Sequence, residues 1–211
     1  MGNVTQLSGN TKVTRDDWLN AARHILVTRG APEVKILTLS DTLSVSRSSF
    51  YWYFKDRTEL LNALLDLWEG TNIKTIVAHC EKPASGIDEA ACNFFRCFVD
   101  PALFDQRLDF AVREWARRDR KVRSRIDAAD ETRLAAVIAM FVRHGYPVEE
   151  AGWRARIIYY MQLGYHALEI HESMETRMSR LPGYIQGFTG KVADPEVVAA
   201  FCEFSLRKVK G

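Results

Sequence analysis

The residues with the clearest chemical potential lie between positions 45 and 55, where a cation, hydroxyl groups and aromatic rings occur together. If this segment is helical, its polar and aromatic side chains share one side at i, i+1, i+4, i+5 and i+8, namely Arg47, Ser48, Tyr51, Trp52 and Lys55. The apolar anchors would face a core on the other side, namely Val45, Phe50 and Phe54. A buried helix would not carry Arg, Ser and Lys together, and a solvated one would seldom carry Tyr and Trp. The mixture suits a DNA major groove, because arginine can bond guanine twice and hydroxyl groups reach phosphates and bases.

Two short helices and a tight turn are needed to position that face. We predict a second helix over residues 35–43, a three-residue turn, and a third helix over 47–54 that the Ser46 side chain caps. A first helix, from about residue 14 to 30, packs behind them. This arrangement is a helix-turn-helix.

Capping residues mark where the first and fourth helices begin. Thr14 can cap the first helix with Asp17 at its third position, and the apolar face that follows is Trp18, Ala21, Ala22, Ile25 and Leu26. Asp56 then caps a long fourth helix, with Glu59 as its reciprocal partner.

Prolines separate the predicted helices in the rest of the chain. We predict further helices near 85–99, 103–118, 121–144, 149–172 and 195–208. No segment alternates apolar and polar residues as a strand does. The sequence therefore predicts an all-α fold: a flexible arm at 1–13, an N-terminal three-helix helix-turn-helix bundle at 14–56, and a larger helical domain at 57–211, joined through the fourth helix.

Composition excludes several classes of protein. The 211 residues are 47% hydrophobic and 27% charged, which suits a globular protein with a sizeable core. The net charge of +2 is carried by residues 1–60, which hold eight Lys/Arg and six Asp/Glu, so a nucleic-acid surface is expected at that end. No apolar run approaches the roughly 20 residues that span a bilayer, and residues 1–14 lack the apolar core of a signal peptide, so we expect a cytoplasmic protein. Four cysteines without paired spacing are predicted to be buried free thiols: Cys80, Cys92, Cys97 and Cys202.

The stretch from Leu39 to Leu61, LSDTLSVSRSSFYWYFKDRTELL, resembles the DNA-binding domain of the TetR family of bacterial regulators. The resemblance is specific over about residues 14–65; beyond them only helical layout and length agree. It implies a dimer that binds a palindromic operator and leaves it when a small molecule enters the C-terminal domain.

The resemblance also implies roles for single residues. Arg47 would read a base edge, Ser48 and Ser49 would contact a base methyl or a phosphate, and Arg57 would hold a phosphate at the start of the fourth helix. The complete predicted DNA-binding set is Lys35, Thr38, Ser46, Arg47, Ser48, Ser49, Tyr51, Trp52, Tyr53, Lys55 and Arg57. The chain departs from the family where Leu37 replaces a polar residue, and where Ser40 and Ser44 stand in place of the favoured Ala and Gly.

The larger domain offers candidates for a ligand site, which in helical domains is mostly apolar with a few placed polar groups. The side chains that could line one are Phe94, Phe98, Phe110, Trp115, Tyr159 and Met161. Each of them could equally belong to ordinary core. Six cations within residues 117–125 are interpreted as a solvated corner, with a site for an anionic effector as the open alternative.

Self-association is predicted from the segment Trp153–Ile170, which is apolar nearly all round and so should be buried on several sides, one of them against a second subunit. The predicted interface is Trp153, Ile157, Tyr160, Gly164 and Leu168, with Val197, Phe201 and Phe204 on the last helix. The resemblance likewise implies a homodimer through the last two long helices. A two-fold dimer reads two operator half-sites.

These patterns predict a ligand-responsive transcriptional regulator, a repressor, that binds double-stranded DNA as a homodimer and is released by a small-molecule effector. The alternative is a helical adaptor that binds protein instead of DNA, since exposed Trp and Tyr also suit protein partners. No nucleophile, phosphate-loop or dinucleotide motif occurs, so neither an enzyme nor a cofactor is predicted. The polar residues at 166–172 lack the i, i+4 His pair of zinc enzymes, so no metal site is predicted.

Overall fold

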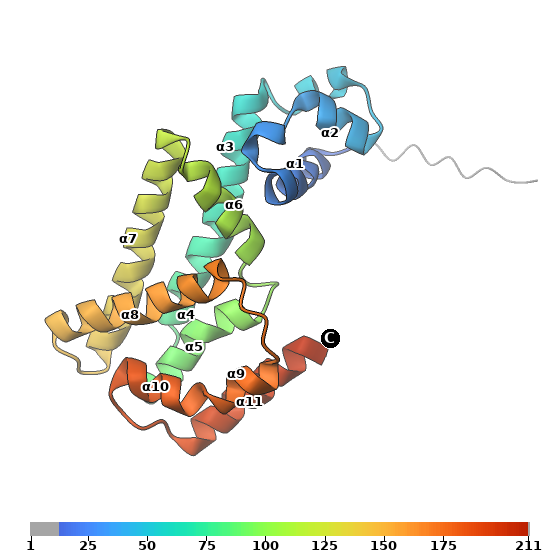
Figure 1. Cartoon of the computed structure of the whole chain (residues 1–211). Coiled ribbons are helices and arrows are strands. Elements are labelled where there is room, and N and C mark those ends of the chain that lie inside the picture. Colours follow the sequence, from blue (N-terminus) through green and yellow to red (C-terminus); the bar gives the residue numbers. More distant parts are fainter. Residues whose placement is uncertain (1–12, 211) are drawn as a thin grey trace, which may run out of the picture. The chain divides into compact units, whose positions relative to one another are not determined.

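The computed structural model describes residues 13–210, and every regular element within that range is helical (Figure 1). The predicted arm at 1–13 lies outside the described residues, apart from Val13. Packing divides the chain into two units, Met1–Leu65 and Asp66–Gly211. The all-α prediction is confirmed.

The first helix, α1 (Arg15–Arg29), begins as predicted. The backbone N–H of Asp17 donates to the Thr14 hydroxyl at 3.2 Å, and the Asp17 carboxylate accepts from the Thr14 backbone N–H at 2.7 Å. The helix ends at Gly30, whose φ of 84° is open to glycine at little cost. Its buried face packs on the bundle core, where the Trp18 and Phe50 rings meet edge to face at 5.3 Å. A short 3₁₀ turn, η1 (Ala31–Glu33), follows.

The second helix is α2 (Ile36–Leu43). Two positions at which the chain departs from the family, Ser40 and Ser44, lie in this helix and directly after it. Ser40 is buried, and its hydroxyl donates to the Ile36 carbonyl at 2.7 Å. Ser44 ends the helix in the left-handed conformation at φ 54°, where glycine carries no steric penalty. The small residues that the family favours at these positions are thus explained by burial and by backbone conformation.

The recognition segment differs from its prediction. It is a 3₁₀ helix, η2 (Arg47–Trp52), where an α-helix over 47–54 was predicted, and the Ser46 side chain does not cap it. The Ser46 hydroxyl lies 2.8 Å from the Ser48 hydroxyl, while the Ser49 hydroxyl donates to the Ser46 carbonyl at 2.7 Å. Short hydroxyl side chains compete here for the groups that a regular cap would use, and the backbone closes i to i+3.

The long fourth helix is one continuous helical stretch with a defect. It comprises α3 (Arg57–Trp68), a π-helical turn η3 (Glu69–Ile73) and α4 (Lys74–Cys80). Asp56 caps it as predicted, accepting from the Glu59 N–H at 2.9 Å. The Glu59 carboxylate reaches back to the backbone N–H of Lys55, at 2.6 Å, one residue before the predicted partner.

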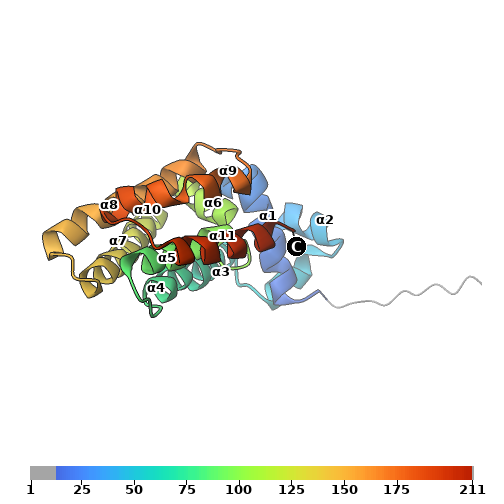
Figure 2. The same ribbon diagram turned by 90° about the horizontal axis from the view of Figure 1, so that it is seen from below.

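The second unit contains the remaining helices. Five lie close to their predicted positions, with α8 ending earlier than the predicted residue 172: α5 (Ile87–Val99), α6 (Gln106–Ala116), α7 (Arg120–Arg143), α8 (Val148–Ala167) and α11 (Pro195–Lys210). Two short helices were not predicted, α9 (Met174–Ser179) and α10 (Leu181–Thr189). Pro182, interpreted as a break, stands in the first turn of α10, where its missing N–H has no helical partner to lose. In this unit α7 packs along α8, and α11 lies beside α5 (Figure 2).

The core of the second unit is built from α4, α5, α7, α8, α10 and α11. The cysteines are free thiols there, three of them buried and Cys202 half-buried. Burial raises the pKa of Cys80 and of Cys92 to about 12. The prediction of unpaired thiols is confirmed, with Cys202 less buried than predicted.

Candidate DNA interface and effector domain

The recognition segment separates its apolar and polar side chains as the sequence predicts. Phe50 and Phe54 are buried, whereas Tyr51 is 60% and Trp52 75% exposed. Arg47, Ser48 and Lys55 are exposed as well, and Ser49 is half-exposed. A cation, hydroxyl groups and two large rings therefore face solvent together from η2 and the residues that follow it.

The second helix contributes little polarity to this surface. Leu37 is 55% exposed, and Thr38 is half-buried. Lys35 is exposed and pairs with the Glu33 carboxylate at 3.1 Å. An exposed surface pair of this kind is weak, so the Lys35 ammonium can exchange its partner at little cost.

Two residues of the predicted DNA-binding set also brace the bundle. The Tyr53 hydroxyl donates to the Val13 carbonyl at 2.6 Å. The Arg57 guanidinium donates to the carbonyls of Val34 and Ala31, both at 2.6 Å, and so ties α3 to the η1 turn. The sequence gave no signal for these contacts, since the partners are backbone carbonyls remote in the chain. Their roles toward DNA stay predictions.

The residues proposed to line a ligand site lie in different environments. Phe94, Phe98 and Tyr159 are buried, whereas Phe110, Trp115 and Met161 are half-buried. Two cavities lie in the second unit. The narrow cavity, about 50 Å³, includes Met161 and lies between α5, α8, α9, α10 and α11. The wide cavity, about 410 Å³, includes Phe110 and lies between α6, α8 and α9.

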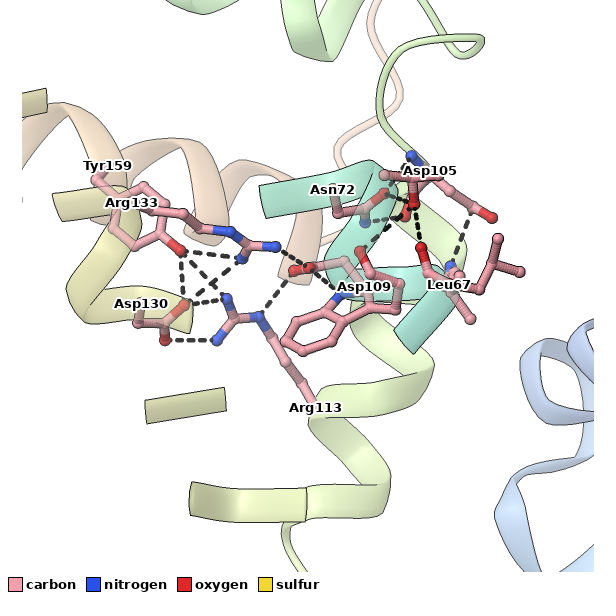
Figure 3. Close-up of polar contacts among 11 residues, drawn as sticks. Leu67, Asn72, Asp105, Asp109, Arg113, Asp130, Arg133 and Tyr159 are labelled. Carbon is pink, nitrogen blue, oxygen red and sulfur yellow. Dashed lines mark hydrogen bonds and ion pairs between the residues drawn. The ribbon is translucent and has the colours of Figure 1, made fainter. Parts of the chain in front are cut away.

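A buried polar network joins the end of α3 to α6 and α7, and sequence patterns did not predict it (Figure 3). Asp109 is fully buried and accepts from Trp68 Nε1 at 2.7 Å, from Arg113 Nε at 2.9 Å and from Arg133 at 2.8 Å. Burial alone would raise the pKa of Asp109, but the guanidiniums of Arg133 and Arg113 outweigh it and lower that pKa to about 2. The carboxylate is therefore ionised, and it fixes the Trp68 ring.

The same network extends to α8. The Tyr159 hydroxyl donates to Asp130 at 2.7 Å and accepts from Arg133 at 3.2 Å. Arg113 pairs with both Asp130 oxygens, at 2.9 and 2.6 Å. Burial raises the pKa of the Tyr159 phenol, so it stays a hydrogen-bond donor. Four helices, α3, α6, α7 and α8, are thus connected through charged hydrogen bonds, the strongest class of these bonds.

The π-helical turn η3 also makes polar contacts with the residues around it. Asn72 is fully buried and exchanges two hydrogen bonds with the Asp105 backbone before α6, at 2.9 and 3.1 Å (Figure 3). From α7, Arg125 pairs with Glu69 at 2.6 Å and with Asp66 at 2.7 Å. Residues 66–73 are therefore tied to both α6 and α7.

The predicted interface residues divide between two environments. A stripe of exposed apolar side chains runs along α8 to Leu168, the residue directly after the helix, which is 74% exposed: Trp153, Ile157, Tyr160 and Leu168. Gly164 lies within this stripe, and a Cβ there would meet no atom within 4 Å. On α11, by contrast, Phe201 is buried, and Val197 and Phe204 are half-buried against the core. The exposed surface therefore lies on α8.

No helix in the described part of the chain is long and apolar enough to cross a membrane. Residues 19–64 match the sequence model described as bacterial regulatory proteins, tetR family. The comparison with curated proteins gives no match.

Solved structures show the same fold. One is described as a putative TetR-family transcriptional regulator from Rhodococcus sp. It is 17% identical to this chain, and the match covers 83% of this chain and 98% of that protein, with a TM-score of 0.59. GusR of Salmonella enterica is 15% identical over 93% of this chain and 95% of its own, with a TM-score of 0.57. At this identity the likeness concerns the fold, and the match over residues 19–64 concerns the helix-turn-helix. Residues 19–64 therefore match the tetR family of bacterial regulatory proteins, and the chain as a whole shares the fold of these two solved structures.

Proposed function

We propose that this protein is a transcriptional repressor that binds a palindromic operator as a homodimer in the cytoplasm and is released by a small-molecule effector. The observation that carries the proposal is the solvent-facing side of η2. Arg47 and the rings of Tyr51 and Trp52 are all exposed on η2, while Phe50 anchors the segment in the bundle. Arginine specifies guanine, and the hydroxyl groups and phenol bond phosphates.

The dimer is proposed to form through the α8 stripe, with a second copy as the partner. Large exposed apolar side chains aligned on one helix are costly in water and mark an interface. Gly164 in the middle of the stripe permits close helix approach. A two-fold axis there gives two recognition segments, which read half-sites roughly one DNA turn of 34 Å apart.

The effector is proposed to act through α3. This helix begins directly after the recognition segment and ends at Trp68, which Asp109 of α6 holds. A ligand that shifts α6 or α7 would shift the end of α3 with them. The switch requires that the ligand bind the two arrangements with different affinity.

Salt dependence of DNA binding tests the proposal. We expect the logarithm of the association constant to fall linearly with the logarithm of salt, by about 0.9 per phosphate neutralised. Arg47→Ala should lower the affinity for a selected operator by about ten-fold or more while leaving affinity for random DNA nearly unchanged. Arg207→Ala, at an exposed arginine of α11, is the matched control and should bind like the wild type.

A protein-binding adaptor would behave differently. It would bind DNA weakly, without preference between operator and random sequence, and Arg47→Ala would leave that binding unchanged. That pattern would contradict the proposal.

A further inference from the structure

Two side-chain amides converge on one imidazole in the second unit. The Nε2 atoms of Gln106 and Gln162 lie 2.7 and 2.6 Å from Nε2 of His166. As the amides lie, their N–H groups share the one lone pair of His166 Nε2, and this arrangement corresponds to the tautomer with its proton on Nδ1. The rings of Phe98 and Phe110 flank the imidazole, with centroids at 5.6 and 6.3 Å. This arrangement fixes a neutral imidazole as a hydrogen-bond donor.

His166 is part of the wall of the wide cavity, which is rich in donors. Arg107 and Arg177 also line it, against one carboxylate, that of Glu169. Burial lowers the pKa of His166 to about 4, so the imidazole stays neutral and carries its single donor proton at neutral pH. With two guanidiniums, the His166 imidazole and one carboxylate in its lining, the cavity is suited to a ligand with a single negative charge.

The remaining lining is mixed, with Gln106, Tyr165 and His171 beside two apolar side chains. Phe110 and Ile170 contribute to the wide cavity, whose volume of about 410 Å³ is in the range of small-molecule sites. Tyr165 and Arg177 belong to both cavities, so the narrow one adjoins the wide one at these two side chains. The planar fork of arginine matches the two oxygens of a carboxylate.

We propose that the wide cavity binds a small organic carboxylate, whose acid group lies between Arg177 and His166 and whose apolar body packs on Phe110 and Ile170. The ligand is the effector only if the proposed function is right, but its binding does not depend on that function.

Calorimetric titration of the full chain, without DNA, tests this site. The probes are hexanoate and benzoate, and hexanamide and benzamide are their uncharged counterparts. We expect at least one acid to bind about ten-fold or more tighter than its amide, because only the acid is an anion in a cavity that both guanidiniums line. Arg177→Gln and Arg107→Gln should each weaken the acid by about five-fold or more, whereas the exposed control Arg207→Gln should not change it.

The proposal is overturned if neither acid binds, if acids and amides bind equally, or if both cavity variants bind like the wild type. Inorganic phosphate that displaces the bound acid at lower concentration would also overturn the carboxylate class. Circular dichroism checks that the variants fold. If Arg177→Gln does not fold, Arg107→Gln still tests the site, because Arg107 is exposed.

DNA binding is measured separately, so the two ideas fail in different ways. Acid binding by a chain that does not bind DNA would reject the proposed function and keep the cavity. A chain that binds an operator but neither acid would keep the proposed function and reject the cavity.

Discussion

At the scale of single residues, His166 makes stability depend on pH. Burial, aided by the nearby Arg177 charge, lowers its pKa from the ordinary 6.5 to about 4. As pH falls below 6.5 the unfolded chain takes up this proton first, so the folded state loses stability down to about pH 4. We expect wild-type stability to fall by up to roughly 1.4 kcal/mol per pH unit in this window through His166 alone.

His166→Gln isolates that contribution. The variant keeps a side chain that can meet Gln106 and Gln162, but it has no titrating group. Urea unfolding between pH 6.5 and 4 should show that the free energy of unfolding of the variant depends less steeply on pH than that of the wild type, by up to one proton. His79 and His144, whose pKa values are also lowered, contribute equally to both proteins. Equal slopes for wild type and variant would rule out a buried neutral imidazole.

Residue types alone predicted which side chains of the recognition segment are exposed. They did not predict the bracing roles of Tyr53 and Arg57. Their partners are carbonyls 40 positions away for Tyr53 and 23 and 26 positions away for Arg57, and backbone acceptors leave no trace in residue type. The ligand candidates are divided between core and cavity walls for a related reason. Aromatic rings at helical spacing fill cores as readily as they line cavities.

At the scale of helices, the ionised Asp109 holds α3, α6 and α7 together. Asp109→Asn should destabilise the fold by about 3–5 kcal/mol, because it leaves the buried Arg133 charge only its longer pair with Asp130, at 3.6 Å. Thermal or urea unfolding measures the loss. Asp127→Asn, which removes an exposed pair with Arg123, is the control and should cost under about 1 kcal/mol.

A double variant sharpens this test. Asp109→Leu with Arg133→Met removes both buried charges, so it should recover much of the stability that either single change loses. Additive losses would mean that the two side chains do not stabilise each other, contrary to the 2.8 Å pair in the structure.

Long helices with regular apolar spacing were predicted to within a few residues at most ends, because burial sets that spacing. The elements that were not predicted each have their own cause. The six-residue α9 buries no side chain fully and is too short to show a period. The 3₁₀ geometry of η2 depends on which hydroxyl bonds which carbonyl, and the π turn η3 depends on Asn72 reaching the Asp105 backbone. The Ser49–Ser46 bond is local and the Asn72–Asp105 bond is a tertiary contact, and residue spacing predicts neither of them.

At the scale of the whole molecule, the exposed α8 stripe predicts the oligomeric state. Tyr160→Glu with Leu168→Glu places two charges in an apolar interface, which should weaken the dimer by about a hundred-fold or more. Sedimentation or light scattering at micromolar concentration should then show a monomer. Val192→Glu, at an exposed site outside the stripe, should remain a dimer. A dimeric double variant would move the interface away from α8.

The central claim is that the face of η2 reads DNA sequence. Selection of binding sites from a random duplex library tests it most directly, because no operator need be known. The full wild-type chain should enrich an inverted repeat, and Arg47→Ala should fail to enrich it or should lose the preference at one position of each half-site. Enrichment of no sequence by the wild type, or of the same sequence equally by Arg47→Ala, would contradict the account.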